Sequence, residues 1–210
     1  KNQIFQVNLL ANRNKNIDNH LTNTPKGFII NPDGRILSPV IKFSIILKGR
    51  IRNMYKIVRK QELNSAVTLL EIEAPFIAKK AHAGQFIIFR IDDQGERVPL
   101  TIAGYDREKG TVTIIFQKVG FSTIALGNLN EGDYIQDFVG PLGKPTPVEG
   151  KKKVCVVGGG VGCAIALPSA AAFKAAGAEV TVIIGFRSKD IVILEEEFKA
   201  VADRLILMTD

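Results

Sequence analysis

The chain has 210 residues, of which 46% are apolar and 23% charged, the composition of an ordinary globular protein with enough material for a core. No stretch approaches the roughly 20 consecutive apolar residues of a membrane-spanning helix, and two cysteines are too few for a disulfide framework and wrongly spaced for a metal or cluster site. The net charge of +7 belongs to residues 1–53, which hold nine Lys and Arg against two acids.

The N-terminal segment, residues 1–53, is also rich in asparagine and sustains no helical or strand period. We expect it to be poorly ordered, apart from a hairpin of Phe28 to Ile30 with Arg35 to Leu37 around the turn Asn31-Pro32-Asp33-Gly34. One hypothesis makes Met54 the biological start; a genuine extension is the alternative. A nucleic-acid-binding protein using this basic arm is a non-enzymatic interpretation, which the scattered charges and few aromatic residues disfavour. No signal peptide is recognisable, so a cytoplasmic protein is expected.

Residues 54–150 show repeated short strand patterns without intervening helices. The runs are YKIVRKQEL, AVTLLEIEA, GQFIIFRID, VTIIFQKVG and DYIQDFVG. Such spacing predicts an antiparallel barrel or sandwich, with one short helix at Ser122 to Leu129. The turn-rich stretch Gly140 to Pro147 is expected to be strandless, and a domain boundary is expected near Gly150.

Residues 151–210 have the βαβαβ period of a nucleotide-binding sheet. Strands are expected at Val154 to Val157, Glu179 to Ile184 and Leu205 to Met208. The first helix ends at Gly177, and the second covers about Ile191 to Asp203. Pro168 leaves two alternatives open, because the first helix either starts at this proline or is kinked there. Three strands make only the first half of such a domain, so we expect the natural protein to continue.

The glycine turn at Gly158, Gly159, Gly160 and Gly162 joins the first of these strands to its helix. Bare backbone ahead of a helix N-terminus is suited to a diphosphate. The sixth position of the dinucleotide fingerprint is Cys163 rather than Gly or Ala, and Gly185-Phe186-Arg187 stands where an acid would bind a ribose. A tight strand-to-helix connection is the structural alternative. Cys155 and Cys163 are expected to pack here as small apolar residues.

Two features of the strand-rich region are also suited to phosphate. In Arg97-Val98-Pro99-Leu100-Thr101, the guanidinium offers bidentate contacts and the threonine a hydroxyl donor; a surface arginine beside a strand-edge proline is the alternative. In Gly120-Phe121-Ser122-Thr123, two hydroxyl residues open the short helix, either as an N-cap or as an anion site.

The ordered set RVPLT, VGFSTIALGNLNEGD, GPLG, VVGGGVG and GFRSKD resembles the ferredoxin-NADP reductase superfamily. It is most similar to the alpha subunits of sulfide dehydrogenase or NADH-dependent ferredoxin-NADP oxidoreductase and to the dihydroorotate dehydrogenase electron-transfer subunit. The resemblance covers Met54 to Asp210. It implies an FAD-binding β-barrel over residues 54–150, followed by the first half of an NAD(P)-binding Rossmann-like domain over 151–210.

The resemblance also implies roles for individual residues. Arg97 would contact the FAD diphosphate, with Val98, Pro99 and Leu100 beside the flavin and Thr101, the one candidate catalytic residue, near flavin N5. Val119, Gly120, Ser122 and Thr123 would place the short helix under that diphosphate. Gly158, Gly159, Gly160 and Gly162 would receive the NAD(P) diphosphate, and Arg187 would lie near the adenosine ribose and read a 2′-phosphate.

The implied activity is an FAD-dependent electron-transfer subunit that passes electrons between NAD(P)H and an iron-sulfur or ferredoxin-type partner, as half of a heterodimer. A free-standing NAD(P)H-flavin reductase with the same barrel is the alternative. Relatives carry a C-terminal four-cysteine [2Fe-2S] site, which residues 1–210 do not supply, so the cluster is expected only in a further C-terminal region.

Overall fold

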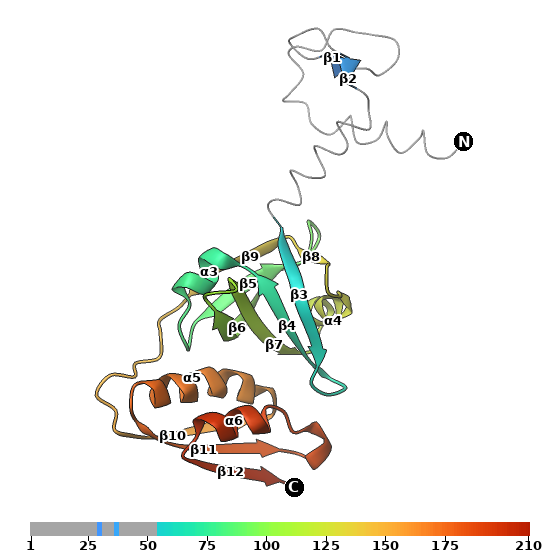
Figure 1. Cartoon of the computed structure of the whole chain (residues 1–210). Helices are drawn as coiled ribbons and strands as arrows, with labels where there is room; N and C mark the ends of the chain where they lie inside the picture. Colours follow the sequence, from blue (N-terminus) through green and yellow to red (C-terminus); the bar gives the residue numbers. More distant parts are fainter. Residues whose placement is uncertain (1–28, 31–35, 38–53) are drawn as a thin grey trace. The chain divides into compact units, whose positions relative to one another are not determined.

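The computed structural model describes residues 29–30, 36–37 and 54–210 (Figure 1). Strands β1 (Ile29–Ile30) and β2 (Ile36–Leu37) pair antiparallel, which confirms the predicted hairpin. The expected disorder of the rest of the first 53 residues falls outside the described residues. Residues 54–210 belong to a separate compact unit, which contains both of the predicted sheets.

Seven antiparallel strands form the larger sheet of this unit. They are β3 (Tyr55–Glu62), β4 (Val67–Glu73), β5 (Phe86–Arg90), β6 (Val98–Asp106), β7 (Thr111–Gln117), β8 (Tyr134–Ile135) and β9 (Asp137–Leu142). The order is β8-β3-β4-β7-β6-β5-β9. The edge strands β8 and β9 are separated in the chain by Gln136 alone, so the sheet curls into a nearly closed barrel (Figure 1). The predicted antiparallel barrel is confirmed.

The barrel encloses a core of branched and aromatic side chains, as the alternating pattern of its strands requires. Ile57, Leu70, Ile87, Phe89 and Phe138 are among the fully buried members. Helix α3 (Pro75–Lys80) contributes Ile77 and Ala78 to the same core. The sequence prediction missed this helix, although a proline at its first position and lysines in its last turn are typical helix signals.

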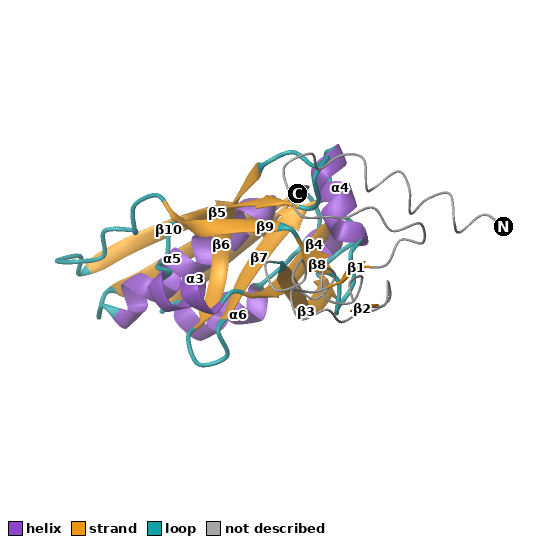
Figure 2. Cartoon of the chain, turned by 90° about the horizontal axis from the view of Figure 1, so that it is seen from above, coloured by secondary structure: helices purple, strands orange, loops and turns teal. Residues whose placement is uncertain are grey.

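The smaller sheet is parallel and has the predicted βαβαβ order. Strands β10 (Lys153–Gly159), β11 (Glu179–Phe186) and β12 (Arg204–Thr209) pair in the order β10-β11-β12. Helix α5 (Cys163–Ala175) follows β10 through the one-turn helix η1 (Gly160–Gly162). Helix α6 (Glu195–Val201) precedes β12. Strands and helices are distinguished by colour in Figure 2.

Four local predictions need correction or resolution. The second helix does not begin near Ile191, because Leu194 adopts a left-handed conformation (φ 61°) just before α6. Pro168 lies inside α5 and does not start it. The stretch from Gly140 is not strandless, since β9 continues to Leu142. Cys155 is exposed on β10 and does not pack as an apolar residue.

The barrel and the parallel sheet share a second apolar cluster. Val67, Leu69 and Ile115 of the barrel strands are buried in it together with Ile184 of β11 and Ile193. Helix α5 lies between the parallel sheet and strand β6 (Figure 1). None of the described helices is long and apolar enough to cross a membrane.

Candidate functional site

The glycine turn forms a close strand-to-helix connection at the carboxyl end of β10. Gly158 is buried, and a Cβ atom there would lie 3.1 Å from Cβ of Ala166 and 3.2 Å from Cα of Cys163. The missing side chain therefore allows α5 to pack directly on β10. Gly160 has a φ of +52°, a conformation that favours glycine, and open space lies where its Cβ would be.

Burial raises the pKa of the Cys163 thiol to about 11, because the apolar surroundings disfavour the thiolate. The thiol therefore stays protonated at neutral pH. Cys163 is buried at the start of α5 and packs as a small apolar residue, as predicted.

A cavity of about 820 Å³ opens over the glycine turn. Its floor comes from the carboxyl ends of the three parallel strands, the edge at which such sheets bind ligands. The barrel forms the other wall through the β3–β4 turn and the end of β7. The lining residues are Asn64, Ala66, Val67, Gln117, Gly159, Gly160, Val161, Gly185, Phe186, Arg187, Ile191, Ile193, Met208, Thr209 and Asp210.

The charged residues that line this cavity are one cation, Arg187, and one carboxylate, Asp210. Arg187 lines it directly after β11 and is exposed. No carboxylate ends β11, since Gly185 and Phe186 occupy that place. The structure therefore brings together three of the predicted residues, Gly159, Gly160 and Arg187, and adds Asn64 and Gln117 from the barrel. The barrel pair was not predicted, because nothing local in the sequence connects them with the glycine turn.

The second candidate region surrounds Arg97, just before β6. Its side chain is 65% exposed, and Nη2 lies 3.6 Å from Oδ2 of Asp137. The same carboxylate oxygen accepts a hydrogen bond of 2.7 Å from Nε of Arg90. Asp137 and Arg90 are paired positions of β9 and β5. The strand register thus fixes a carboxylate that orients Arg97 while leaving its guanidinium open to solvent.

Helix α4 (Phe121–Asn128) begins near Arg97, one residue earlier than predicted. Its N-cap is Gly120, which has no side chain to satisfy the first-turn N–H groups. The Thr123 hydroxyl accepts hydrogen bonds from the N–H groups of Val119 (3.1 Å) and Gly120 (3.0 Å). Ser122 Oγ donates to Oε2 of Glu96 at 3.3 Å. The segment that carries Arg97 therefore meets the start of α4.

The residues of the RVPLT motif alternate across β6. Val98 and Leu100 pack against the barrel core, and Pro99 and Thr101 occupy the alternate positions, opposite Ile88 and Phe86 of β5. Successive strand residues point to opposite faces of a sheet. The geometry therefore separates Pro99 and Thr101 from Val98 and Leu100, which support the strand from the core side.

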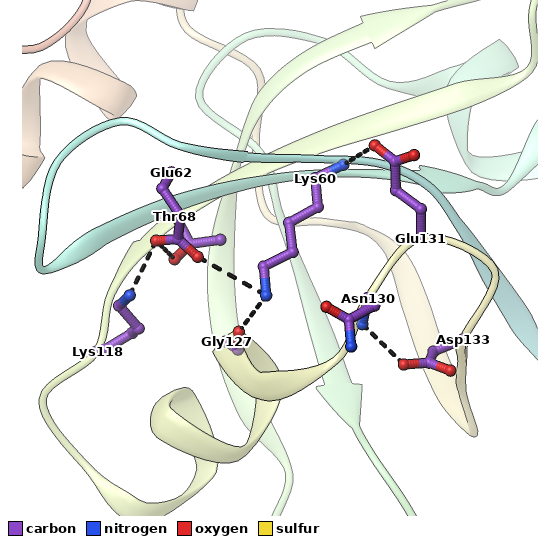
Figure 3. Close-up of polar contacts among 8 residues, drawn as sticks. All are labelled: Lys60, Glu62, Thr68, Lys118, Gly127, Asn130, Glu131 and Asp133. Atoms are coloured by element: carbon purple, nitrogen blue, oxygen red, sulfur yellow. Dashed lines mark hydrogen bonds and ion pairs between the residues drawn. The ribbon is translucent and has the colours of Figure 1, made fainter.

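A polar cluster anchors α4 to the barrel from the opposite end (Figure 3). Lys60 Nζ donates to the carbonyl oxygen of Gly127 in the last turn of α4 at 2.6 Å and lies 3.7 Å from Glu62. Lys118 and Thr68 donate to Oε2 of Glu62 at 2.9 and 2.8 Å. A cation at the carboxyl end of a helix is favourable. The sequence did not reveal this cluster, whose members come from four separate segments.

Partial burial acts to raise the pKa of Glu62, but the hydrogen bonds from Lys118 and Thr68 and the charges of Lys118 and Lys60 outweigh it. The pKa of Glu62 is therefore held below its ordinary value. The ionised carboxylate holds the two lysines that lie before and beneath α4.

Comparison with known proteins shows relatives over most of this part of the chain. A Clostridium beijerinckii protein named for its place in an adh 3′ region is 50% identical over 164 residues, 75% of this chain and 55% of the relative. A Thermotoga maritima homologue of the dihydroorotate dehydrogenase B (NAD⁺) electron transfer subunit is 41% identical over 155 residues, 74% of this chain and 55% of the relative. No family model matches the chain.

A solved structure of an NADH-dependent reduced ferredoxin-NADP oxidoreductase superimposes with a TM-score of 0.71 at 40% identity, over 75% of this chain and 57% of that one. The chain belongs to the ferredoxin-NADP reductase superfamily. Phthalate dioxygenase reductase, at 18% identity and a TM-score of 0.64, shares the superfamily fold. The chain spans little more than half the length of the relatives it matches, 55% in the two protein sequences above.

Proposed function

We propose that this superfamily member is the flavin- and nicotinamide-binding part of an electron-transfer subunit of an oxidoreductase. Residues 54–150 would form the FAD-binding barrel and residues 151–210 the first half of the NAD(P)-binding domain. The observation that supports the proposal is that two separate places in one compact unit have residues suited to phosphate. One combines Arg97 with the start of α4, and the other is the cavity over Gly159 and Gly160.

The residues at the first site fit an FAD diphosphate. Arg97 presents an exposed guanidinium, oriented by Asp137, for bidentate contacts with phosphate oxygens. The first-turn N–H groups of α4 and the positive end of its dipole add donors and charge of the same sign. Thr101, on the face of β6 opposite the core, would donate a hydrogen bond to a ring nitrogen. Pro99, two residues before it, would line the same wall.

The residues at the second site fit the diphosphate of a nicotinamide nucleotide. Gly159 and Gly160 line the cavity and leave open the space that side chains would fill, so the backbone of the turn would be available to a diphosphate. Gly158 and Gly162 would support the turn and not line the cavity. Bound at these two sites, the flavin and the nicotinamide would supply hydride transfer and the release of single electrons. The residues of the chain would bind the two cofactors and orient them toward each other.

Names of relatives favour a subunit over an independent enzyme. The Thermotoga maritima and Fusobacterium nucleatum relatives are named as electron transfer subunits or homologues of them. A second oxidoreductase subunit, in a heterodimer, would then be the partner, and a ferredoxin or iron-sulfur protein the electron acceptor. Among the described residues, no three His, Cys, Asp or Glu side chains gather in a way that suits a metal ion, and any [2Fe-2S] cluster would be held elsewhere in the natural protein.

The absorption spectrum of the purified full-length protein tests the proposal. Bound oxidised flavin gives bands near roughly 375 and 450 nm, and anaerobic addition of NADH or NADPH should bleach them. A colourless, folded protein that takes up no FAD would overturn the flavin assignment. A free-standing flavin reductase would reduce added free flavin in many turnovers without a ferredoxin-type acceptor, which separates that alternative from a subunit.

A further inference from the structure

Asn64 occupies the turn between β3 and β4, at the barrel wall of the 820 Å³ cavity. Its Oδ1 accepts hydrogen bonds from the N–H groups of Ala66 (3.0 Å) and Val67 (2.9 Å). The side chain therefore satisfies the backbone of its own turn, as asparagine commonly does. These two bonds alone would give Asn64 only a local role.

The other end of the same amide reaches the parallel-sheet half. Nδ2 donates to the carbonyl oxygen of Ile191 at 3.2 Å. Ile191 ends the short helix η2 (Lys189–Ile191), which follows Arg187 and also lines the cavity. The other side-chain hydrogen bond between the two halves that involves described residues joins Thr146, in the connecting segment, to Ser169 at 3.2 Å. Asn64 therefore makes the side-chain hydrogen bond that joins the two halves at the cavity.

Apolar packing surrounds this hydrogen bond. Val67 and Ile193 are buried in the cluster shared by the two halves, and Ile191 packs against it. The two halves would therefore remain in contact without the Asn64 bond. The hydrogen bond adds a fixed position, because its distance and angle requirements hold the Ile191 carbonyl at one place on the β3–β4 turn. Apolar contacts are not directional and would allow the two surfaces to shift.

We propose that Asn64 is a positioning residue of the nucleotide cavity, in which one amide holds both the barrel wall and the loop that carries Arg187. The inference rests on the proposed function. Hydride transfer requires reacting atoms about 3–3.5 Å apart, and a displacement of about 1 Å costs roughly a hundredfold in rate. A residue that fixes the two walls therefore affects the nucleotide and its transfer step without touching either reacting ring.

The variant Asn64→Asp in the full-length, flavin-loaded protein tests this role. Aspartate retains the oxygen that accepts from Ala66 and Val67, but it places a second oxygen against the Ile191 carbonyl. We expect KM for the preferred nicotinamide nucleotide to rise about tenfold and the rate of flavin reduction at saturation to fall. Flavin content should stay unchanged.

The matched control is Ser65→Asp. Ser65 is exposed in the same turn, so this variant adds the same charge one residue away and leaves the amide in place. Equal kinetics for Asn64→Asp and Ser65→Asp would overturn the proposal, since the effect would then be one of charge. Loss of flavin in Asn64→Asp would overturn it too, because the substitution would then act on the flavin half and not on the Ile191 loop.

The wild-type protein in the same experiment separates this inference from the proposed function. A wild type that binds no flavin, or whose flavin no nicotinamide nucleotide reduces, contradicts the function itself. A wild type that is reduced normally while Asn64→Asp behaves identically contradicts only the positioning role. Asn64→Ala, which removes the turn bonds as well, should show the same kinetic change with added loss of stability.

Discussion

Helices α4 and α5 both have a glycine at the N-cap, Gly120 and Gly162, but their surroundings differ. At α4 the proposed anion site would depend on side chains, because Arg97 is exposed and its neighbour Glu96 bonds to Ser122 at the helix start. At α5 the site would depend on bare backbone, because Gly159 and Gly160 leave the cavity floor open. Charge-based recognition is strong and depends on one guanidinium, whereas backbone recognition is spread over several N–H groups and depends on the absence of side chains.

Removing the guanidinium should produce the largest effect. Arg97→Ala should weaken FAD binding by roughly ten- to a hundredfold, the range expected for a lost charge-assisted hydrogen bond. Flavin absorbance retained after gel filtration measures it. Arg59→Ala is the control, because Arg59 is a 53% exposed barrel arginine that pairs with Glu71. Unchanged flavin content in Arg97→Ala would reject the diphosphate role.

The proposed site before α5 should be disabled by adding a side chain, whereas the site at α4 is disabled by removing one. Gly160→Ala places a Cβ in the open space over the turn, at a φ of +52° that alanine tolerates poorly. We expect about tenfold weaker binding of the nicotinamide nucleotide with FAD content unchanged. Titration of the reduced nucleotide by fluorescence provides the measurement.

The control for Gly160→Ala is Gly132→Ala. Gly132 also has a positive φ (+92°) and open space around its Cβ position, but it lies in the turn before β8. The strain of an alanine is at least as large at the φ of Gly132 as at that of Gly160, because the left-handed region of non-glycine residues lies near roughly +50 to +70°. If Gly132→Ala weakens nucleotide binding as much as Gly160→Ala, strain and not the filled cradle is responsible.

The same contrast explains which parts of the molecule the sequence could predict. The glycine turn and the parallel strands were predicted because their pattern is local, as Gly158 beside a run of valines shows. The orientation of Arg97 was not, since Asp137 is brought beside it only by the register of β5 with β9. The start of α6 was misplaced because Leu194 has a left-handed conformation that local propensity does not predict. Leu194 is only 8% exposed, so its conformation depends on tertiary packing.

Arg187→Ala sharpens the comparison by testing whether a side chain adds selectivity to the backbone site. Arg187 is the only arginine or lysine among the described residues that line the cavity, and we propose it as the side chain that would contact a ribose 2′-phosphate. We expect NADPH binding to weaken about five- to tenfold, as for one hydrogen-bonded charge, with a smaller change for NADH. Equal losses for the two nucleotides would show that Arg187 does not discriminate between them.

The smallest expected effect concerns the support behind α4. Glu62 holds Lys60 and Lys118, and its pKa lies below the ordinary 4.5 because their hydrogen bonds and charges outweigh partial burial. A depressed folded-state pKa means that the contribution is present above about pH 4.5 and disappears as the pH falls through the folded value. Glu62 is 45% exposed, so solvent screening limits the contribution to about 1 kcal/mol or less.

Glu62→Gln should therefore lower the free energy of unfolding slightly at pH 7, and denaturant titrations should show the difference from wild type shrinking below pH 4.5. Glu73→Gln, at an exposed glutamate of β4, is the control, and a difference between Glu62→Gln and wild type that grows on acidification would contradict the role given to the Glu62 carboxylate.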